Sequence, residues 1–340
     1  MNKPRVAVAS LGGTITMTTT QPNGSGVRPS LGIDELLSAA PALAEVAQLE
    51  AKTLARMPGA SLGFPEVLNA LEWARNATLR GADGVVLVQG TDTLEETSYL
   101  LDLYWDRPEP LVVTGAMRPP QTPGADGPSN LLASVLVAGA PASRGLGALV
   151  VMNDEVHAAS RVRKTRTSGV NAFTSSSFGP LGYVEERRPV FGNRPPRWPH
   201  LTPPSSHEPK RVVILETFLG DDGTLLDLVA NAGFDGLVIA GLGAGHIPEG
   251  LTRSVDKAVQ AGPVVLTSRA GSGTVFENTY DFIGSETDLL KRGLVSGGWL
   301  DARKARVLLS CLLSCNSTQS EISAEFSRRG GNPGGPLIVE

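Results

Sequence analysis

Two threonines stand directly after apolar segments of this 340-residue chain, where a hydroxyl group could do chemistry. Thr14 follows Arg5–Ser10 in the motif Leu-Gly-Gly-Thr-Ile, and Thr91 follows Gly84–Val88 in the motif Gln-Gly-Thr-Asp-Thr. A hydroxyl becomes a nucleophile when a neighbouring group takes its proton and hydrogen-bond donors stabilise the oxyanion. The glycines before Thr14 allow a tight turn, which is also compatible with an ordinary end of a strand, and their spacing is not that of a dinucleotide-binding fingerprint.

A helix is expected to begin just after Thr91, and two acidic residues lie at its start. Asp92 in the capping position and Glu95 three residues later would form a capping box, which explains both residues without a catalytic role. The free amide groups of the same helix N-terminus would also suit an anionic group of a substrate. Capping does not explain why a second threonine stands at the same edge of the sheet.

A third candidate is the basic segment Ser160–Arg166, which reads Ser-Arg-Val-Arg-Lys-Thr-Arg. Such a stretch is commonly a solvated surface. The functional alternative is that Lys164 reaches Thr91 and Asp92, where an amino group could exchange protons with the hydroxyl. The sequence leaves both alternatives open.

The cysteines offer no clear set of metal ligands. The chain has two, Cys311 and Cys315, which lie four residues apart in an apolar segment that is predicted to be helical. Without nearby histidines, this arrangement favours neither a zinc site nor a structural disulfide, and it is typical of a reducing compartment. We expect no metal and no organic cofactor.

Composition narrows the class of protein. With 41% hydrophobic and 19% charged residues, the chain can bury a sizeable core in about two domains. The 30 basic and 34 acidic residues give a formal net charge of −4, which disfavours a nucleic-acid binder, so the expected ligand is a small molecule. We recognise neither a cleavable leader nor an apolar run of about 18 residues, and therefore expect a soluble, cytoplasmic protein without a membrane segment.

The elements that would position these residues alternate between strand and helix. Strands are predicted at Arg5–Ser10, Gly84–Val88, Leu111–Thr114 and Ala148–Met152, and helices at Ile33–Ala39, Pro65–Thr78, Leu94–Trp105 and Ser129–Ala138. This alternation predicts an α/β domain with a parallel sheet covered by helices on both faces. Ligands of such sheets bind beyond the carboxyl ends of the strands, which is where both threonines are expected.

A proline-rich and charged stretch, Glu185–Arg211, separates this pattern from a second one. Later strands are predicted at Arg211–Thr217, Gly236–Ala240 and Pro263–Thr267, and helices at Leu225–Ala232, Leu251–Ala261 and Ala302–Leu313. The sequence thus predicts an N-terminal domain over residues 1–185, a linker over 186–210 and a smaller α/β domain over 211–340. The last residues, from Arg328 onward, are expected to be a tail or a packing arm.

Several motifs occur in an order that resembles the bacterial type I/II L-asparaginases of the asparaginase/glutaminase superfamily. They lie at Gly12–Ile15, Gln89–Thr97, Gly115–Pro119, Ala125–Leu131, Val150–Asp154, Phe178–Val184 and Ala305–Leu309. The resemblance implies a larger flavodoxin-like parallel-sheet domain plus a smaller C-terminal α/β domain. It also implies a homodimer or homotetramer, with active sites at the intimate dimer interface between the larger domain of one subunit and the smaller domain of its neighbour.

The resemblance implies catalytic roles for four residues. Thr14 matches the primary nucleophile of the family, whereas Thr91, Asp92 and Lys164 match its second threonine triad. The implied reaction converts L-asparagine to L-aspartate and ammonia. Thr14 would attack the side-chain carbonyl, ammonia would leave, and water would hydrolyse the acyl-enzyme.

Substrate-binding residues are also implied by the resemblance. Asp92 matches the residue that holds the α-amino group of the substrate. The pair Ala60 and Ser61 falls where the family binds the α-carboxylate with serine and glutamine, so Ser61 is the better match. Glu286 aligns with a glutamate that the neighbouring subunit contributes to the α-amino pocket.

Two departures from the family pattern affect these expectations. Many members carry a tyrosine on the loop after the first threonine, whereas the segment Thr18–Ser30 contains none. The activating group for Thr14 therefore stays open. Many members also have an asparagine where Ala244 follows Gly243, which bears on the choice between asparagine and glutamine.

The sequence is also compatible with three alternatives to a dedicated asparaginase, which differ in testable features. A glutaminase-asparaginase of broad specificity differs only in how the pocket treats one methylene, which commonly changes selectivity by about 10- to 200-fold. The related amidotransferase subunit carries an extra N-terminal domain. Here the first strand is expected within about five residues of Met1, which disfavours this alternative. A non-catalytic amino-acid-binding module would be expected to lack one of the catalytic residues Thr14, Thr91 and Lys164.

Overall fold

The structure is a computed structural model that describes residues 3–19, 27–38, 40–204 and 209–331. The chain divides into two compact units, Met1–Leu201 and Thr202–Glu340, which are described separately. Part of the loop after the first threonine and most of the C-terminal stretch lie outside the described residues. Within the described part of the chain, every helix is too short or too polar to cross a lipid bilayer.

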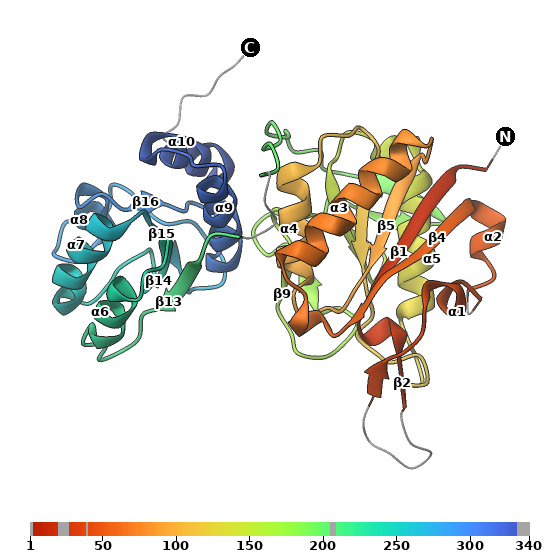
Figure 1. Cartoon of the computed structure of the whole chain (residues 1–340), viewed down its shortest axis with the longest axis horizontal. Helices are drawn as coiled ribbons and strands as arrows, with labels where there is room; N and C mark the ends of the chain where they lie inside the picture. The colour runs from red at the N-terminus through yellow and green to blue at the C-terminus, as the bar shows by residue number, and fades with distance from the viewer. Residues whose placement is uncertain (1–2, 20–26, 39, 205–208, 332–340) are drawn as a thin grey trace. The chain divides into compact units, whose positions relative to one another are not determined.

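The larger unit is built on one eight-stranded sheet with the order β12-β11-β8-β7-β6-β5-β1-β4 (Figure 1). Its parallel strands are β1 (Arg5–Gly12), β4 (Gln48–Met57), β5 (Gly84–Val88), β6 (Leu111–Thr114) and β7 (Ala148–Met152). The strands β8 (Glu155–Ala158), β11 (Gly182–Glu185) and β12 (Arg188–Phe191) continue it in antiparallel pairing. Strands β5, β6 and β7 are buried at every residue, which explains their uninterrupted apolar sequences.

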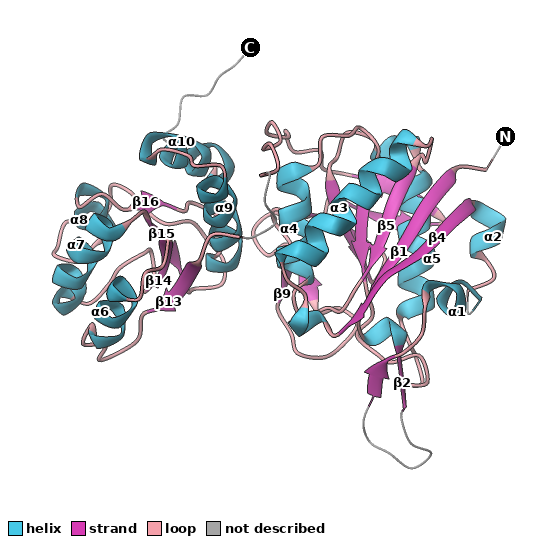
Figure 2. Cartoon of the chain, viewed as in Figure 1, coloured by secondary structure: helices cyan, strands magenta, loops and turns pink. Residues whose placement is uncertain are grey.

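Helices cover both faces of this sheet (Figure 2). The helices α3 (Phe64–Leu79) and α4 (Leu94–Tyr104) pack together on one face, and α1 (Ile33–Ser38), α2 (Leu43–Val46) and α5 (Gly127–Gly139) lie on the other. The core on the α5 face is formed by residues of the sheet and of these helices, among them Val6, Val86, Ile33 and Leu131. The α/β fold with a parallel sheet is therefore confirmed.

Two short ladders lie beside the main sheet. The strand β9 (Arg163–Lys164) pairs with β10 (Phe173–Thr174), and β2 (Met17–Thr19) pairs with β3 (Val27–Pro29). The turn Thr14–Thr16 (η1) follows β1, and the turn Gly59–Ser61 (η2) follows β4. The ladder of β9 carries Lys164, and both turns carry residues that the sequence marked as candidates.

The boundary between the domains differs from the one that the sequence predicts. Strand β12 lies inside the predicted linker 186–210, and the larger unit continues to Leu201. The linker prediction is thus corrected at residues 188–191, where the chain adds an edge strand to β11. Pro189 is compatible with such a strand because an edge leaves one row of backbone groups unpaired, but it also makes the segment look like a loop in sequence.

The smaller unit contains a four-stranded parallel sheet, in the order β13 (Val212–Glu216), β14 (Gly236–Gly241), β15 (Val264–Ser268) and β16 (Val295–Ser296). Its helices are α6 (Thr224–Asn231), α7 (Thr252–Ala261), α8 (Glu286–Lys291), α9 (Ala302–Ser314) and α10 (Gln319–Gly330). Helix α9 begins where the Asp301 carboxylate accepts hydrogen bonds from the amides of Arg303 and Lys304. A second, smaller α/β unit is therefore present.

Candidate active site

Three glycines bring three loops together at the carboxyl edge of the larger sheet. Gly13 follows β1, Gly59 follows β4 and Gly90 follows β5. A Cβ on Gly13 would lie 2.1 Å from the Gly90 nitrogen, and a Cβ on Gly90 would lie 2.7 Å from the Gly59 Cα. These backbones are in direct contact, so the residues that follow the glycines, including Thr14 and Thr91, are held in one neighbourhood.

Thr14 is the first residue of the tight turn η1 and is half-buried. Gly12 and Gly13 precede it with φ of 109° and 90°, which L side chains rarely adopt. The turn is closed because the Thr16 amide and the Thr16 hydroxyl both donate to the Gly13 carbonyl, at 2.9 and 2.8 Å. The two glycines predicted to shape this turn thus set the direction in which the chain presents Thr14.

Lys164 reaches Thr91 across 73 positions of sequence. Its Nζ donates to the Thr91 Oγ1 at 2.9 Å and lies 3.5 Å from the Asp92 Oδ1. Thr91 is buried and Lys164 is mostly buried, whereas the Asp92 side chain is 57% exposed. The structure therefore brings together the hydroxyl, amine and carboxylate that the sequence singled out, with the carboxylate open to solvent.

Helix α4 does not begin with the predicted capping box. Its N-cap is Thr93, and no side chain caps the first turn. The Thr93 hydroxyl instead donates to the Gly59 carbonyl at 2.9 Å, and the Glu95 Oε2 accepts from the Lys164 amide at 2.7 Å. The capping interpretation of Asp92 and Glu95 is wrong. The N-cap is Thr93, and the side chains of Thr93 and Glu95 bond to other segments of the chain.

The pair predicted to bind a carboxylate lies on the same edge of the sheet. Ala60 and Ser61 are the last two residues of η2 and both are exposed. The turn is closed by a hydrogen bond from the Ser61 amide to the Pro58 carbonyl at 3.0 Å. Because Gly59 contacts Gly90, this exposed turn lies beside the Thr91 loop.

Glu286 belongs to the smaller unit, where it is fully buried at the start of α8. Its Oε1 accepts hydrogen bonds from the amides of Thr279 and Tyr280, at 3.1 and 2.8 Å. Its Oε2 lies 3.0 Å from the His246 Nε2, and the His246 ring packs edge-on against Tyr280. Both carboxylate oxygens are therefore held by partners of the same unit.

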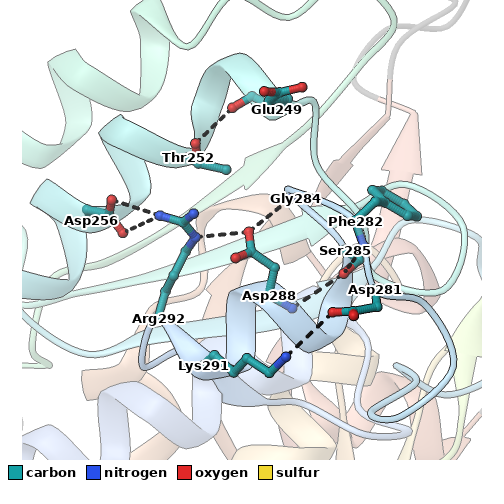
Figure 3. A network of polar contacts seen from close by, with 10 residues as sticks. All are labelled: Glu249, Thr252, Asp256, Asp281, Phe282, Gly284, Ser285, Asp288, Lys291 and Arg292. Carbon is teal, nitrogen blue, oxygen red and sulfur yellow. Dashed lines mark hydrogen bonds and ion pairs between the residues drawn. The ribbon is translucent and has the colours of Figure 1, made fainter.

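A polar network fixes the helix that carries Glu286 (Figure 3). The Arg292 guanidinium donates to both oxygens of Asp256, at 2.9 and 2.8 Å, and to Asp288 at 2.9 Å. Asp288 also accepts from the Gly284 amide at 2.9 Å, and the Ser285 hydroxyl caps α8 by accepting from the Asp288 amide. Arg292 thereby joins both ends of α8 to α7.

Hydrogen bonds join two of the motifs in the larger unit, Gly115–Pro119 and Ala125–Leu131. The buried Asp126 accepts hydrogen bonds from the amides of Met117 and Arg118, each at 2.9 Å. Asn130, one turn later on α5, donates to the Gly115 carbonyl and to Asp126, each at 3.0 Å. These contacts fix the loop after β6 to the helix that follows it.

A buried histidine lies close to the ladder that carries Lys164, and sequence reasoning missed it. The His157 Nδ1 lies 3.1 Å from the hydroxyl of Ser175, the residue that directly follows β10. Burial lowers the pKa of His157 to about 4, so its ring is neutral near pH 7. Glu155 lies 3.2 Å from the other ring nitrogen without the alignment of a hydrogen bond, and burial raises the pKa of that carboxyl.

Comparisons with known proteins agree with this architecture. A family model for the asparaginase N-terminal domain matches residues 5–197, and one for the glutaminase/asparaginase C-terminal domain matches residues 211–326. The chain is 34% identical to a probable periplasmic L-asparaginase of Haemophilus influenzae, over 95% of this chain and 92% of that protein. It is 31% identical to L-asparaginase 2 of Escherichia coli, over 96% and 93%.

A solved structure shows the same fold. The chain superposes on the probable cytoplasmic L-asparaginase of Campylobacter jejuni with a TM-score of 0.84 and 30% sequence identity, covering 95% of this chain and 99% of that one. The family models together span most of the sequence, in the two units that the structure separates. The chain therefore belongs to the asparaginase family.

Proposed function

We propose that this protein hydrolyses L-asparagine to L-aspartate and ammonia, with Thr14 as the nucleophile. The observation that carries the proposal is the contact between the Lys164 Nζ and the Thr91 Oγ1, at 2.9 Å, beside the backbone contact of Gly13 with Gly90. Two hydroxyls and an amine are thereby held at one edge of the sheet. Membership of the asparaginase family supports an amide as the substrate.

The proposed reaction proceeds in two displacements. The Thr14 hydroxyl attacks the side-chain carbonyl, the bond to the amide nitrogen breaks, and ammonia leaves carrying the proton that the hydroxyl gave up. Water then hydrolyses the acyl-enzyme and restores Thr14. Thr91 polarises the carbonyl, and Lys164 stabilises charge on the Thr91 oxygen and exchanges protons with it. These steps use side chains of the protein and one water molecule.

The charged ends of the amino acid would bind to separate groups. Asp92 is the proposed partner of the α-ammonium group, since its carboxylate is exposed and next to Thr91. The turn of Ala60 and Ser61 would hold the α-carboxylate, with the Ser61 hydroxyl as donor. Glu286 is proposed to complete the α-amino pocket from the smaller unit of a second copy of the chain.

We further propose a homodimer or homotetramer whose sites are shared between copies. The location of Glu286 in the smaller unit supports this assembly, because the threonines belong to the larger one. Sedimentation equilibrium measures the oligomer. Refolding the inactive Thr14→Ala and Glu286→Gln variants together should restore activity in mixed sites if copies share them, and a mixture without activity contradicts the proposal.

We propose a cytoplasmic location because both cysteines are free thiols. Cys311 is buried and Cys315 exposed, and neither forms a disulfide, which suits a reducing compartment. Relatives differ in location, since one is named periplasmic and another cytoplasmic. Cell fractionation with antibody detection tests this location, and recovery from the periplasm would contradict it.

The decisive test is ammonia release by the purified protein, supplied separately with L-asparagine and L-glutamine. Turnover of asparagine by the wild type and its loss in the folded Thr14→Ala variant are the expected results. Comparable turnover of glutamine would leave the reaction class intact but contradict the specificity. Binding of asparagine without ammonia release would instead establish an amino-acid-binding protein.

A further inference from the structure

The Glu95 carboxylate joins helix α4 to the strand that carries Lys164. Glu95 lies in the first turn of α4 and is 2% exposed, and its Oε2 accepts from the Lys164 amide at 2.7 Å, 69 positions away. A buried carboxylate is costly unless hydrogen bonds compensate for the lost water. A bond from an amide to a charged oxygen is among the stronger hydrogen bonds in proteins, and a helix N-terminus favours negative charge.

The same turn therefore holds Lys164 at two points. The backbone amide is bound to Glu95, and the Nζ is bound to Thr91, which lies four residues before Glu95. Strand β9 is two residues long and pairs with an equally short β10, so this ladder alone provides little rigidity. Because the Lys164 main chain is fixed by Glu95, the strand cannot shift and carry the amine away from Thr91.

We infer that Glu95 is a positioning residue that sets the distance between the Lys164 amine and Thr91, an inference that rests on the catalytic role proposed for Lys164. Glu95 acts through the position of its oxygen. Rate losses of roughly 100-fold accompany a displacement of about 1 Å in a catalytic group. Substrate binding should be little affected, because the bond from Glu95 to Lys164 does not involve the proposed substrate-binding residues Asp92 and Ser61.

The test compares three substitutions that change this oxygen differently. In Glu95→Gln an amide oxygen can accept the same bond without the charge, so kcat is expected to stay within about 5-fold of wild type. In Glu95→Asp the charge remains but the oxygen retreats by one methylene, so kcat should fall roughly 10- to 100-fold. In Glu95→Met the acceptor is lost, and kcat should fall at least as far. In both impaired variants KM is expected to remain within about 3-fold of wild type.

Asp102 provides a matched control on the same helix. Its Oδ1 accepts a hydrogen bond from the Ala148 amide at 2.9 Å. Ala148 begins β7, so this bond lies at the amino ends of the parallel strands, away from the candidate site. Asp102→Leu removes the same kind of bond without touching Lys164. It should lower the melting temperature while leaving kcat unchanged, which separates positioning from general stability.

A double substitution shows whether Glu95 acts through Lys164. If it does, Glu95→Asp should lower the residual rate of a Lys164→Met variant by less than 2-fold, measured with isotope-labelled asparagine. The inference is overturned if Glu95→Asp keeps full kcat, if Glu95→Gln loses as much as Glu95→Asp, or if the effects of Glu95→Asp and Lys164→Met multiply. A Lys164→Met variant with normal turnover contradicts instead the proposed role of Lys164.

Discussion

The backbone of Gly13 lies directly against the backbone of Gly90. A Cβ on Gly13 would stand 2.1 Å from the Gly90 nitrogen and 2.2 Å from its Cα. Because β1 and β5 are neighbouring parallel strands, this contact joins the loops that leave their carboxyl ends. The separation of Thr14 from Thr91 is thus set by main-chain atoms, which cannot move aside as a side chain can.

Gly13→Ala is expected to abolish turnover and lower the free energy of unfolding by roughly 3 kcal/mol or more, because overlap adds to the strain of a positive φ. Gly145→Ala is the matched control. Gly145 also has a positive φ, of 76°, but a Cβ there would meet no atom within 4 Å. The control should cost roughly 1 kcal/mol and keep full activity. Denaturant unfolding and ammonia release measure both, and equal effects of the two substitutions would contradict the role of the glycine contact.

Lys164→Met is expected to lower kcat by roughly 100- to 1,000-fold, the usual effect of removing one group that stabilises charge in a transition state. The fold should persist, since the apolar stem of the side chain is kept. Lys257→Met is the control, because Lys257 forms an exposed ion pair with Asp227 at 3.0 Å in the smaller unit. Steady-state kinetics would show near-normal turnover for Lys164→Met if the contact with Thr91 had no catalytic role.

Local sequence patterns predicted the strands whose environment is uniform. The runs at β5, β6 and β7 are apolar throughout because every residue of these strands is buried. Strand β4 escaped prediction because it lies at the edge of the sheet, and none of its residues is fully buried. Its sequence therefore lacks the apolar run on which the other predictions depended.

The candidate site shows the same division. The position of Thr14 and Thr91 after two strands follows from their place in sequence, since parallel strands end at one edge. The bond from Lys164 to Thr91 joins segments 73 positions apart, so no local pattern contains it. Glu95 was misassigned because a capping box and a carboxylate bound to a distant amide look alike in sequence.

Arg292→Met is expected to lower the stability of the smaller unit by roughly 2 kcal/mol, because Asp256 and Asp288 would lose a shared, partly buried cation. Lys291→Met is a control one residue away, since Lys291 forms an exposed pair with Asp281 at 3.5 Å and should contribute little. Figure 3 shows both pairs. If Glu286 serves the substrate as proposed, Arg292→Met should also raise the KM for asparagine. Equal melting temperatures of the two variants would contradict the stabilising role of the Arg292 ion pairs.

Acid should destabilise the larger unit through His157. Burial lowers the pKa of this histidine to about 4, below its ordinary value of 6.5, so between these values the unfolded chain binds a proton that the folded chain does not. The stabilising contribution is therefore complete above about pH 6.5 and is lost progressively as the pH falls towards 4, by at most roughly 3 kcal/mol. Glu155 acts in the opposite direction, because burial raises the pKa of its carboxyl and its folded form retains a proton more readily.

The His157→Asn variant isolates this contribution from that of the carboxylates. Asparagine can still bond to the Ser175 hydroxyl but does not titrate, so its free energy of unfolding should fall less steeply between pH 6.5 and 4 than that of wild type. Since Ser175 directly follows β10, the wild type should also lose kcat reversibly in this range as the ladder bearing Lys164 loosens. Urea unfolding at half-unit intervals of pH measures the difference. Parallel stability curves for the two proteins would show that folding does not lower the pKa of His157, and the buried contact with Ser175 would then have no part in the acid response.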